Sequence, residues 1–166
     1  MENNAYAMRL ATQEDVDFIL ACFALPHARS FLRAPDRKQL VRALADGDML
    51  HLILEMNGAR AGILRLRSIA KNWAIAELSL LIATQPRAGA GRFMTEFAKR
   101  FAFEERKAHR LCLEFVSANE PARKLYESCG FVREGTFREG FPADDGTFAD
   151  LEAYGMLARE FRTGVW

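Results

Sequence analysis

Long apolar runs, an excess of one charge and paired cysteines are all missing from this chain of 166 residues. Its 23 basic and 22 acidic residues leave a formal charge of +1, so no global field directs the protein toward nucleic acid or a membrane surface. Nucleic-acid binding also calls for a clustered basic surface with exposed aromatic residues, which the balanced composition does not indicate. We therefore expect neither nucleic acid nor membrane among its partners.

Cysteine is scarce, and the spacing of the cysteines shows no disulfide or metal-binding pattern. Cys22, Cys112 and Cys129 are odd in number and lie far apart, without CxxC or Cys/His spacing. This excludes a disulfide framework and a zinc site of the usual kinds. The sequence predicts reduced thiols and no metal.

Targeting signals are absent as well. The first residues lack the basic start and apolar run of a signal peptide, which predicts a cytoplasmic location. The most apolar window, Trp73–Ala83, contains Glu77 and is far shorter than the ~20 residues that a membrane helix needs. A buried strand explains it better.

The elements that are present alternate between strand and helix patterns, without a linker or internal repeat, which predicts a single α/β domain over residues 1–166. Asn57-Gly58 is a strong hairpin signal between two β-rich runs. A polar, proline-bounded loop is expected at 26–36. The expected strands are Met8–Ala11, Met49–Met56, Ala59–Ile69, Trp73–Ala83, Leu111–Phe115, Phe131–Arg138 and Thr147–Leu157. The expected helices run from Thr12 to before Pro26, from Arg37 to Ala45, from Arg92 to Lys107 and from Asn119 to Cys129.

A glycine-containing turn, residues 85–92, lies between a predicted strand and a long predicted helix. Amide groups at a helix start carry the positive end of the dipole, and glycines there let a pyrophosphate approach closely. Arg87 and Arg92 would add charge. The pattern is neither a Walker loop nor GxGxxG, and a tight connection is an equally ordinary explanation of Gly89 and Gly91.

A second pattern covers residues 119–131, where Asn119 precedes a short helix that Gly130 ends. Asparagine as N-cap, Pro121 in the first turn and glycine after the last turn account for a plain amphipathic helix. Physical reasoning alone leaves open whether the segment does more than cap and pack.

The two patterns together resemble the acetyl-CoA-binding core of the GNAT superfamily. A Gly-x-Gly helix start is followed by Asn119 and a short helix ending in Leu-Tyr-Glu-x-x-Gly-Phe. Residues 131–139, Asp150 and the run Tyr154-Gly155-Met156-Leu157 resemble the branch of ribosomal-protein N-terminal acetyltransferases and some small-amine acetyltransferases. One departure is Pro86, which occupies a motif position usually held by Gln or Arg.

The resemblance implies a fold, a donor and a set of site residues. The fold is a mixed, mostly antiparallel sheet of about six to seven strands flanked by about four helices. The donor is acetyl-CoA, with no metal. Tyr126 is implied as the general acid for the thiolate, with a core aromatic as the alternative. The implied cofactor contacts come from Leu81, Ile82, Ala83, Arg87, Ala88, Gly89, Ala90, Gly91, Arg92, Asn119, Arg123 and Tyr126.

Glu77 is the only charged residue in Trp73–Ala83, and a carboxylate inside an apolar strand is costly unless it is paired or working. Burial would raise its pKa toward the range useful for a general base. An ion pair with Arg65 or Arg67 on the preceding strand is an equal alternative.

Three functions fit the resemblance. The first is acetylation of a protein or peptide N-terminal α-amine. The second is acetylation of a small amine such as a polyamine, an aminoglycoside or an amino acid, and the third is a non-catalytic acyl-CoA-binding module. Loops 26–36 and 138–149 are expected to select the acceptor, and the protein is expected to be a monomer or a homodimer.

Overall fold

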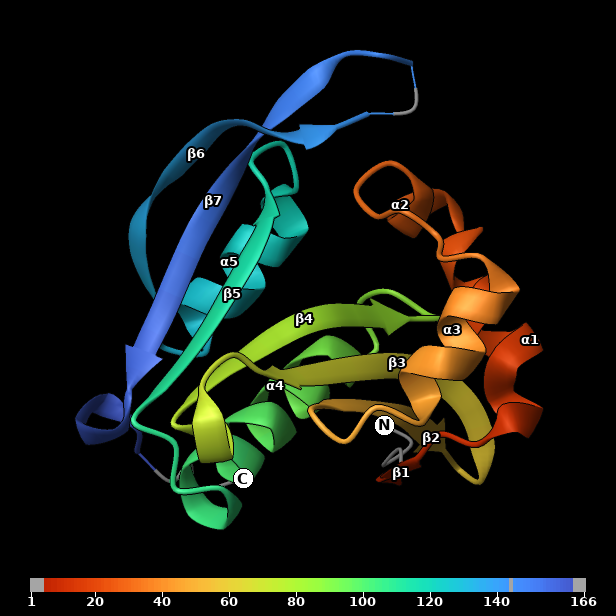
Figure 1. Cartoon of the computed structure of the whole chain (residues 1–166), viewed down its shortest axis with the longest axis horizontal. Helices are drawn as coiled ribbons and strands as arrows, with labels where there is room; N and C mark the ends of the chain where they lie inside the picture. Colours follow the sequence, from red (N-terminus) through yellow and green to blue (C-terminus); the bar gives the residue numbers. More distant parts are fainter. Residues whose placement is uncertain (1–4, 144, 163–166) are drawn as a thin grey trace. The chain divides into compact units, whose positions relative to one another are not determined.

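The computed structural model describes residues 5–143 and 145–162. Seven strands follow one another in the hydrogen-bonded order β1-β2-β3-β4-β5-β7-β6 (Figure 1). Their bounds are β1 Tyr6–Leu10, β2 Met49–Met56, β3 Ala59–Ser68, β4 Ile75–Ala83, β5 Arg110–Val116, β6 Val132–Pro142 and β7 Phe148–Leu157. The helices are α1 Val16–Phe23, α2 Pro26–Arg29, α3 Arg37–Leu44, α4 Ala90–Arg100 and α5 Glu120–Ser128. The predicted mixed α/β sheet is confirmed.

Contacts divide the chain into two compact units. The first comprises Met1–Arg67 and Leu78–Met94, and the second comprises Ser68–Glu77 and Thr95–Trp166. Because β4 and α4 each contribute residues to both units, we propose that the chain works as the single domain that the sequence predicts.

The first unit is an antiparallel meander covered by helices. β2 pairs with β1 from Tyr6↔Met56 to Leu10↔Leu52, and with β3 on its other side. The β2–β3 turn has left-handed backbone at Asn57 and Gly58, with φ of 53° and 80°. A type I′ turn requires positive φ at both central residues, which explains why the Asn-Gly signal predicted this hairpin.

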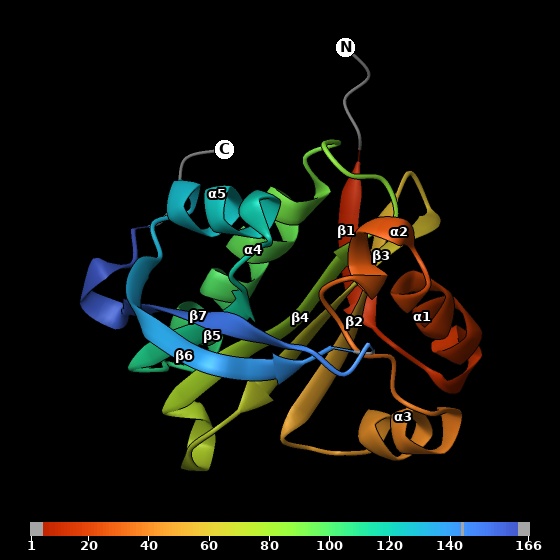
Figure 2. The ribbon, with the colours of Figure 1, turned by 90° about the horizontal axis from the view of Figure 1, so that it is seen from above.

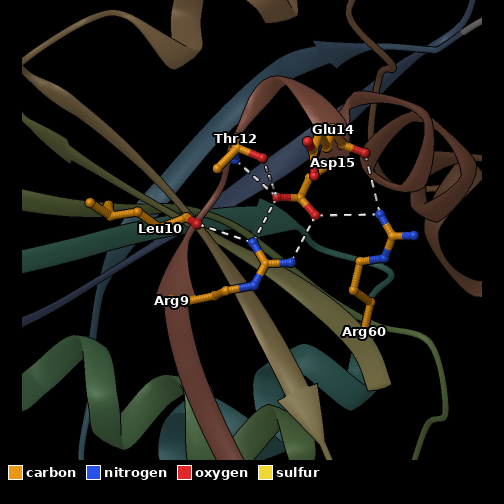
Figure 3. Close-up of a pocket in the computed structure, with 6 residues that line it drawn as sticks. All are labelled: Arg9, Leu10, Thr12, Glu14, Asp15 and Arg60. Atoms are coloured by element: carbon orange, nitrogen blue, oxygen red, sulfur yellow. Dashed lines mark hydrogen bonds and ion pairs between the residues drawn. The ribbon is translucent and has the colours of Figure 1, made fainter. Parts of the chain in front are cut away.

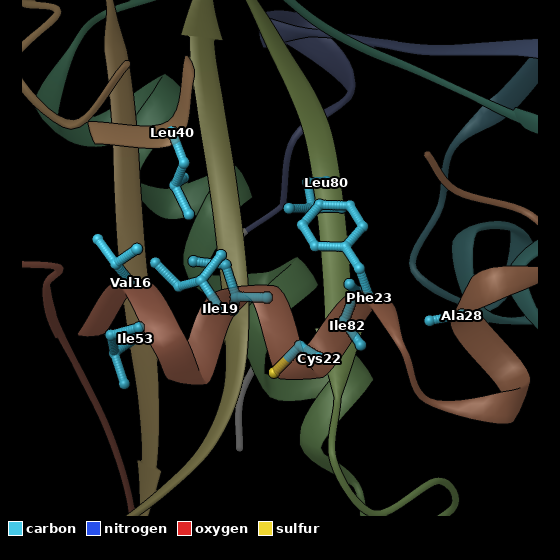
Figure 4. Close-up of a cluster of buried hydrophobic side chains, with 10 residues drawn as sticks. Val16, Ile19, Cys22, Phe23, Ala28, Leu40, Ile53, Leu80 and Ile82 are labelled. Atoms are coloured by element: carbon cyan, nitrogen blue, oxygen red, sulfur yellow. The ribbon is translucent and has the colours of Figure 1, made fainter. Parts of the chain in front are cut away.

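The core of the first unit lies between α1, α2, α3 and the sheet (Figure 4). Ile19 of α1 and Ile53 of β2 are completely buried, and Leu80 and Ile82 of β4 close the cluster. Each such side chain stabilises the fold by about 1.5–3 kcal/mol relative to exposure. The same packing therefore fixes the C-terminal half of β4.

The second unit begins with a parallel pair. Ile75, Ala76 and Glu77 of β4 pair in register with Arg110, Leu111 and Cys112 of β5. β5 then pairs antiparallel with β7, and β7 with β6. Figure 2 shows α5 on one face of these strands.

Three expected boundaries were wrong. Pro26 starts the short helix α2 instead of a loop, because proline is compatible with the first position of a helix. α4 begins at Ala90 instead of Arg92 and gives way at Phe101 to a π-helical turn, Phe101–Glu105. β4 begins at Ile75 because Trp73 is left-handed, with φ of 61°, and its ring packs edge-on against Phe101 at 5.6 Å.

Candidate active site

The turn before α4 has the backbone expected of an anion-binding loop. Arg87 and Gly89 are left-handed, with φ of 68° and 84°, and they flank Ala88. The Phe93 amide donates to the Gly89 carbonyl at 3.0 Å, so α4 starts immediately after this glycine. Alternating backbone handedness and a helix start are the features from which proteins build amide nests for phosphates. The turn therefore fits the pyrophosphate of acetyl-CoA.

The end of β4 is held by short contacts to β3. The Thr84 amide and hydroxyl both donate to the Ala61 carbonyl, at 2.8 Å and 3.0 Å. A Cβ on Gly62 would lie 2.6 Å from the Ile82 carbonyl oxygen, so only glycine permits this approach. Since the Ile82 side chain points into the core, its neighbours Leu81 and Ala83 occupy the opposite face of the strand.

His27, from α2, reaches this strand end. Its Nε2 lies 2.9 Å from the Ala83 carbonyl oxygen, an arrangement in which Nε2 carries the proton and donates. The imidazole is otherwise exposed. His27 therefore lies against Ala83, one of the residues that the family resemblance implies as a cofactor contact.

The second unit holds the other expected site residues on and before α5. Asn119 is the N-cap, and its Oδ1 accepts from the Ala122 amide at 3.2 Å. Tyr126 is 7% exposed, with its ring 5.7 Å from Phe115 and 5.9 Å from Phe131 between centroids. Within the described ranges no residue hydrogen-bonds to its hydroxyl, which is therefore available to a ligand.

Burial determines the protonation of Tyr126. Desolvation is the largest cause that raises the pKa of this phenol above its ordinary value of 10, and the nearby Cys129 thiol adds to it. The hydroxyl therefore keeps its proton throughout the neutral range. A protonated phenol without a protein partner can serve as a proton donor to a leaving thiolate.

Arg123, one turn before Tyr126, makes contacts within the protein. Its Nε donates to Glu120 at 3.1 Å, and its Nη2 donates to the Ser117 carbonyl at 3.0 Å. The guanidinium also lies 5.8 Å from the centre of the Phe115 ring. These contacts tie the first turn of α5 to β5, and the predicted contact of Arg123 with the cofactor stays a prediction.

Tyr154 of β7 was missed as a residue of this region. Its ring packs against Phe115, which also contacts Tyr126, with a centroid distance of 5.1 Å. Its hydroxyl donates to Glu127 of α5 at 2.8 Å. Burial and this hydrogen bond raise its pKa. The sequence predicts a β-strand here and gives Tyr154 a place in the family pattern, but it does not show the contact with Glu127, which is 27 residues away.

Glu77 is 9% exposed, and it is the last residue of β4 that pairs with β5, opposite Cys112. Paired residues of adjacent strands point to the same face, so Glu77 shares the face of Cys112, while Phe115 and Tyr126 lie on the other. Burial, followed by the Glu77 charge, raises the pKa of the Cys112 thiol. A base at Glu77 and an acid at Tyr126 would thus act from opposite faces of the sheet, and both alternatives for Glu77 stay open.

A separate pocket in the first unit is lined by an ion cluster (Figure 3). It measures about 490 Å³ and includes none of the expected site residues. Arg9 Nη1 and Nη2 donate to the two carboxylate oxygens of Asp15, at 2.7 Å and 2.9 Å, and Arg60 approaches the same group at 3.4 Å. These contacts hold the pKa of Asp15 well below its usual range. The cluster joins β1 and β3 to the start of α1.

The described residues offer neither a metal-binding cluster nor a membrane-spanning helix. Residues 5–143 and 145–162 contain no group of three or more His, Cys, Asp or Glu side chains placed to hold a metal ion. Within the same ranges, every helix is too short or too polar to span a bilayer. All three cysteines are free thiols, with Cys22 and Cys129 buried.

Comparison with known proteins identifies the class. Residues 7–132 match the model of the acetyltransferase (GNAT) domain, so the chain belongs to the GNAT family. The class is that of the acetyl-CoA-dependent N-acetyltransferases.

One curated relative is YdaF of Bacillus subtilis (strain 168), a candidate ribosomal N-acetyltransferase. It is 30% identical over 122 residues, which cover 72% of this chain and 66% of YdaF, slightly less than two thirds of its length.

Solved structures share the fold at lower identity. Spermidine N-acetyltransferase of Vibrio cholerae, in complex with CoA and spermine, superposes with a TM-score of 0.77 at 20% identity, over 93% of this chain and 96% of that one. An acetyltransferase-like protein of T. thermophilus gives 0.79 at 24% identity, over 96% and 89%. Their resemblance concerns the fold.

Proposed function

We propose that this protein moves an acetyl group from acetyl-CoA directly onto a primary amine, and that Tyr126 is the general acid. The observation that carries the proposal is a buried, protonated phenol whose hydroxyl has no partner among the described residues. It lies on the Asn119-capped helix of a chain that belongs to the GNAT family. The ring is buried, but the hydroxyl is not among the buried unbonded polar atoms of the described residues, so it reaches the surface, where a ligand can bond to it.

The proposed reaction needs no covalent enzyme intermediate. The neutral amine attacks the thioester carbonyl carbon, and a nitrogen–carbon bond forms while the carbonyl oxygen takes up negative charge. The carbon–sulfur bond then breaks, and the departing thiolate takes the proton of the Tyr126 hydroxyl. The proton lost by the amine passes to water, or through water to Glu77, and from there to solvent. The Tyr126 phenolate regains a proton from solvent, and the products are an amide and the CoA thiol.

The donor is proposed to lie along β4 and the turn that follows it. Leu81, Ile82 and Ala83 supply the backbone edge for the pantetheine arm, and a β4 amide meets the developing oxyanion. The amides of residues 87–92 hold the pyrophosphate, with Arg87 and Arg92 exposed beside it. Asn119 contacts the pantetheine arm or a bound water while it caps α5.

The proposed acceptor is a protein or peptide N-terminal α-amine. The 30% identity with YdaF supports this choice. A small amine such as a polyamine is the second candidate, because spermidine N-acetyltransferase has the same fold. The carboxylates of the β6–β7 hairpin favour neither, since Asp145 accepts from Thr147 and Asp150 accepts from the Glu139 amide. A non-catalytic module is disfavoured by the unengaged Tyr126 hydroxyl.

Turnover across an acceptor panel tests the proposal. CoA thiol release is measured with peptides bearing a free α-amine, the same peptides with a blocked N-terminus, spermidine, an aminoglycoside and free amino acids. We expect the free peptides to be acetylated at the α-nitrogen and the blocked ones to be inert. Turnover with spermidine alone would move the assignment to the second candidate, and acetyl-CoA binding without turnover on any amine would favour the non-catalytic module.

A further inference from the structure

Tyr6, at the start of β1, touches the turn proposed to hold the pyrophosphate. Its hydroxyl donates to the Ala88 carbonyl, 82 residues away in sequence. Its ring also packs against Phe93, the fourth residue of α4, with centroids 5.1 Å apart. One side chain therefore contacts the turn and the helix that follows it, and all these residues belong to the first unit.

The hydrogen bond fixes the direction of one peptide group. In a trans peptide the C=O and the following N–H point in opposite directions. Since Tyr6 holds the Ala88 carbonyl on the side of β1, the Gly89 amide must point away from β1. The left-handed φ values of Arg87 and Gly89 show that the chain reverses on both sides of this peptide.

Peptide direction matters for anion binding. An amide hydrogen pointing at a phosphate is attractive, whereas a carbonyl oxygen in the same place is repulsive. Glycine on the C-terminal side of the Ala88–Gly89 peptide would otherwise allow that peptide to rotate between the two orientations. A Cβ at Gly89 would have the Tyr6 hydroxyl as its nearest neighbour, at 3.8 Å, so the hydroxyl lies beside this flexible peptide.

We propose that Tyr6 is a positioning residue for the donor: it preorganises the 87–92 turn so that its amides face the pyrophosphate. The inference rests on the proposed function, because it requires acetyl-CoA to bind at this turn. Tyr6 acts through the peptide that it holds. Preorganisation lowers the cost of ordering the turn on binding, so its loss weakens affinity without changing the chemical step.

The test compares two donors in the Tyr6→Phe variant. Acetyl-CoA carries the pyrophosphate, and S-acetylpantetheine has the same thioester and arm without it. Losing one hydrogen bond should weaken the binding of acetyl-CoA by about tenfold, measured by calorimetry and as a rise in KM. The kcat value with saturating acetyl-CoA and the kcat/KM value with S-acetylpantetheine should stay at the parental values.

Ser68→Ala is the matched control, since it also removes a hydroxyl that donates to a backbone carbonyl, that of Ala70, and Ser68 lies outside the proposed site. It should leave both donors unaffected. Parental acetyl-CoA affinity in Tyr6→Phe would overturn the inference, as would an equal loss with both donors, which indicates a general structural role. If the parental protein itself shows no saturable acetyl-CoA binding, the proposed function fails together with the inference, and that result is recognised before any variant is made.

Discussion

Tyr126→Phe removes one hydroxyl and keeps a ring that packs against Phe115 and Phe131. Because no described residue hydrogen-bonds to that hydroxyl, its loss leaves no broken partner behind. We expect the free energy of unfolding to stay within about 0.5 kcal/mol of the parent. The affinity for acetyl-CoA should also be unchanged.

The chemical step should respond very differently. The raised pKa keeps the phenol protonated at the pH of the assay, so the parental enzyme always has the proton to donate. Removing a general acid costs typically ~10²–10⁴ in rate. This corresponds to about 3–5 kcal/mol of transition-state stabilisation, expressed in kcat.

Tyr154→Phe provides a matched comparison on the same Phe115 ring. Its hydroxyl donates to Glu127 at 2.8 Å, so the substitution removes a hydrogen bond that ties β7 to α5. We expect a loss of about 1 kcal/mol in unfolding free energy, with kcat near the parental value. The two variants should therefore show opposite patterns of stability and turnover.

Urea unfolding and single-turnover kinetics measure the two quantities independently. Single-turnover conditions report the chemical step even where product release limits the steady state. A parental single-turnover rate in Tyr126→Phe would refute the acid assignment and leave water or Glu77 as the proton donor. Equal losses of rate in both variants would show that aromatic packing, and not proton transfer, controls the step.

Three further predictions concern the turn, β3 and β2. Gly91→Val should weaken acetyl-CoA binding at least tenfold while the melting temperature changes little. Gly89→Val should lower both the affinity for acetyl-CoA and the melting temperature, because a branched residue is strained at a φ of 84°. Gly62→Ala should destabilise the protein by about 2 kcal/mol in urea unfolding, since its Cβ would meet backbone at 2.6 Å; Gly47→Ala, with nothing within 4 Å, should be neutral. Burial lowers the pKa of His51 from 6.5 to about 4, so the unfolded chain binds this proton more readily than the folded protein does. The stability of the fold is therefore complete above the unfolded pKa of 6.5 and falls as the pH drops from 6.5 toward the folded pKa of about 4. About 2 kcal/mol of unfolding free energy should disappear between about pH 7 and about pH 5, and His51→Leu should remove that slope.

The elements that sequence reasoning found are those coded by neighbouring residues. The Asn57-Gly58 turn needs two positive φ values that these residue types supply, and Asn119 caps α5 through an amide three residues away. Local rules were less certain at Pro26, where the same residue can end one helix or begin the next. The boundary error at α2 follows from that ambiguity.

The parts that sequence reasoning missed depend on contacts between distant residues. Tyr6 reaches Ala88 across 82 positions, and Tyr154 reaches Glu127 across 27. Glycine is required at position 62 because the backbone of β4 lies too close for a Cβ. The sequence around Gly62 does not indicate this contact. The family resemblance predicts the site residues, and the structure shows which contacts hold those residues in place.

The proposed function requires that this chain use acetyl-CoA to acetylate an amine. The most direct measurement is isothermal titration with acetyl-CoA, followed by amine-dependent release of CoA thiol in the presence of a chelator. We predict saturable binding to the parental protein and thiol release that requires both an acceptor amine and the Tyr126 hydroxyl. The absence of saturable binding at millimolar acetyl-CoA would contradict the proposed function, and thiol release that stops in chelator would contradict the metal-free mechanism.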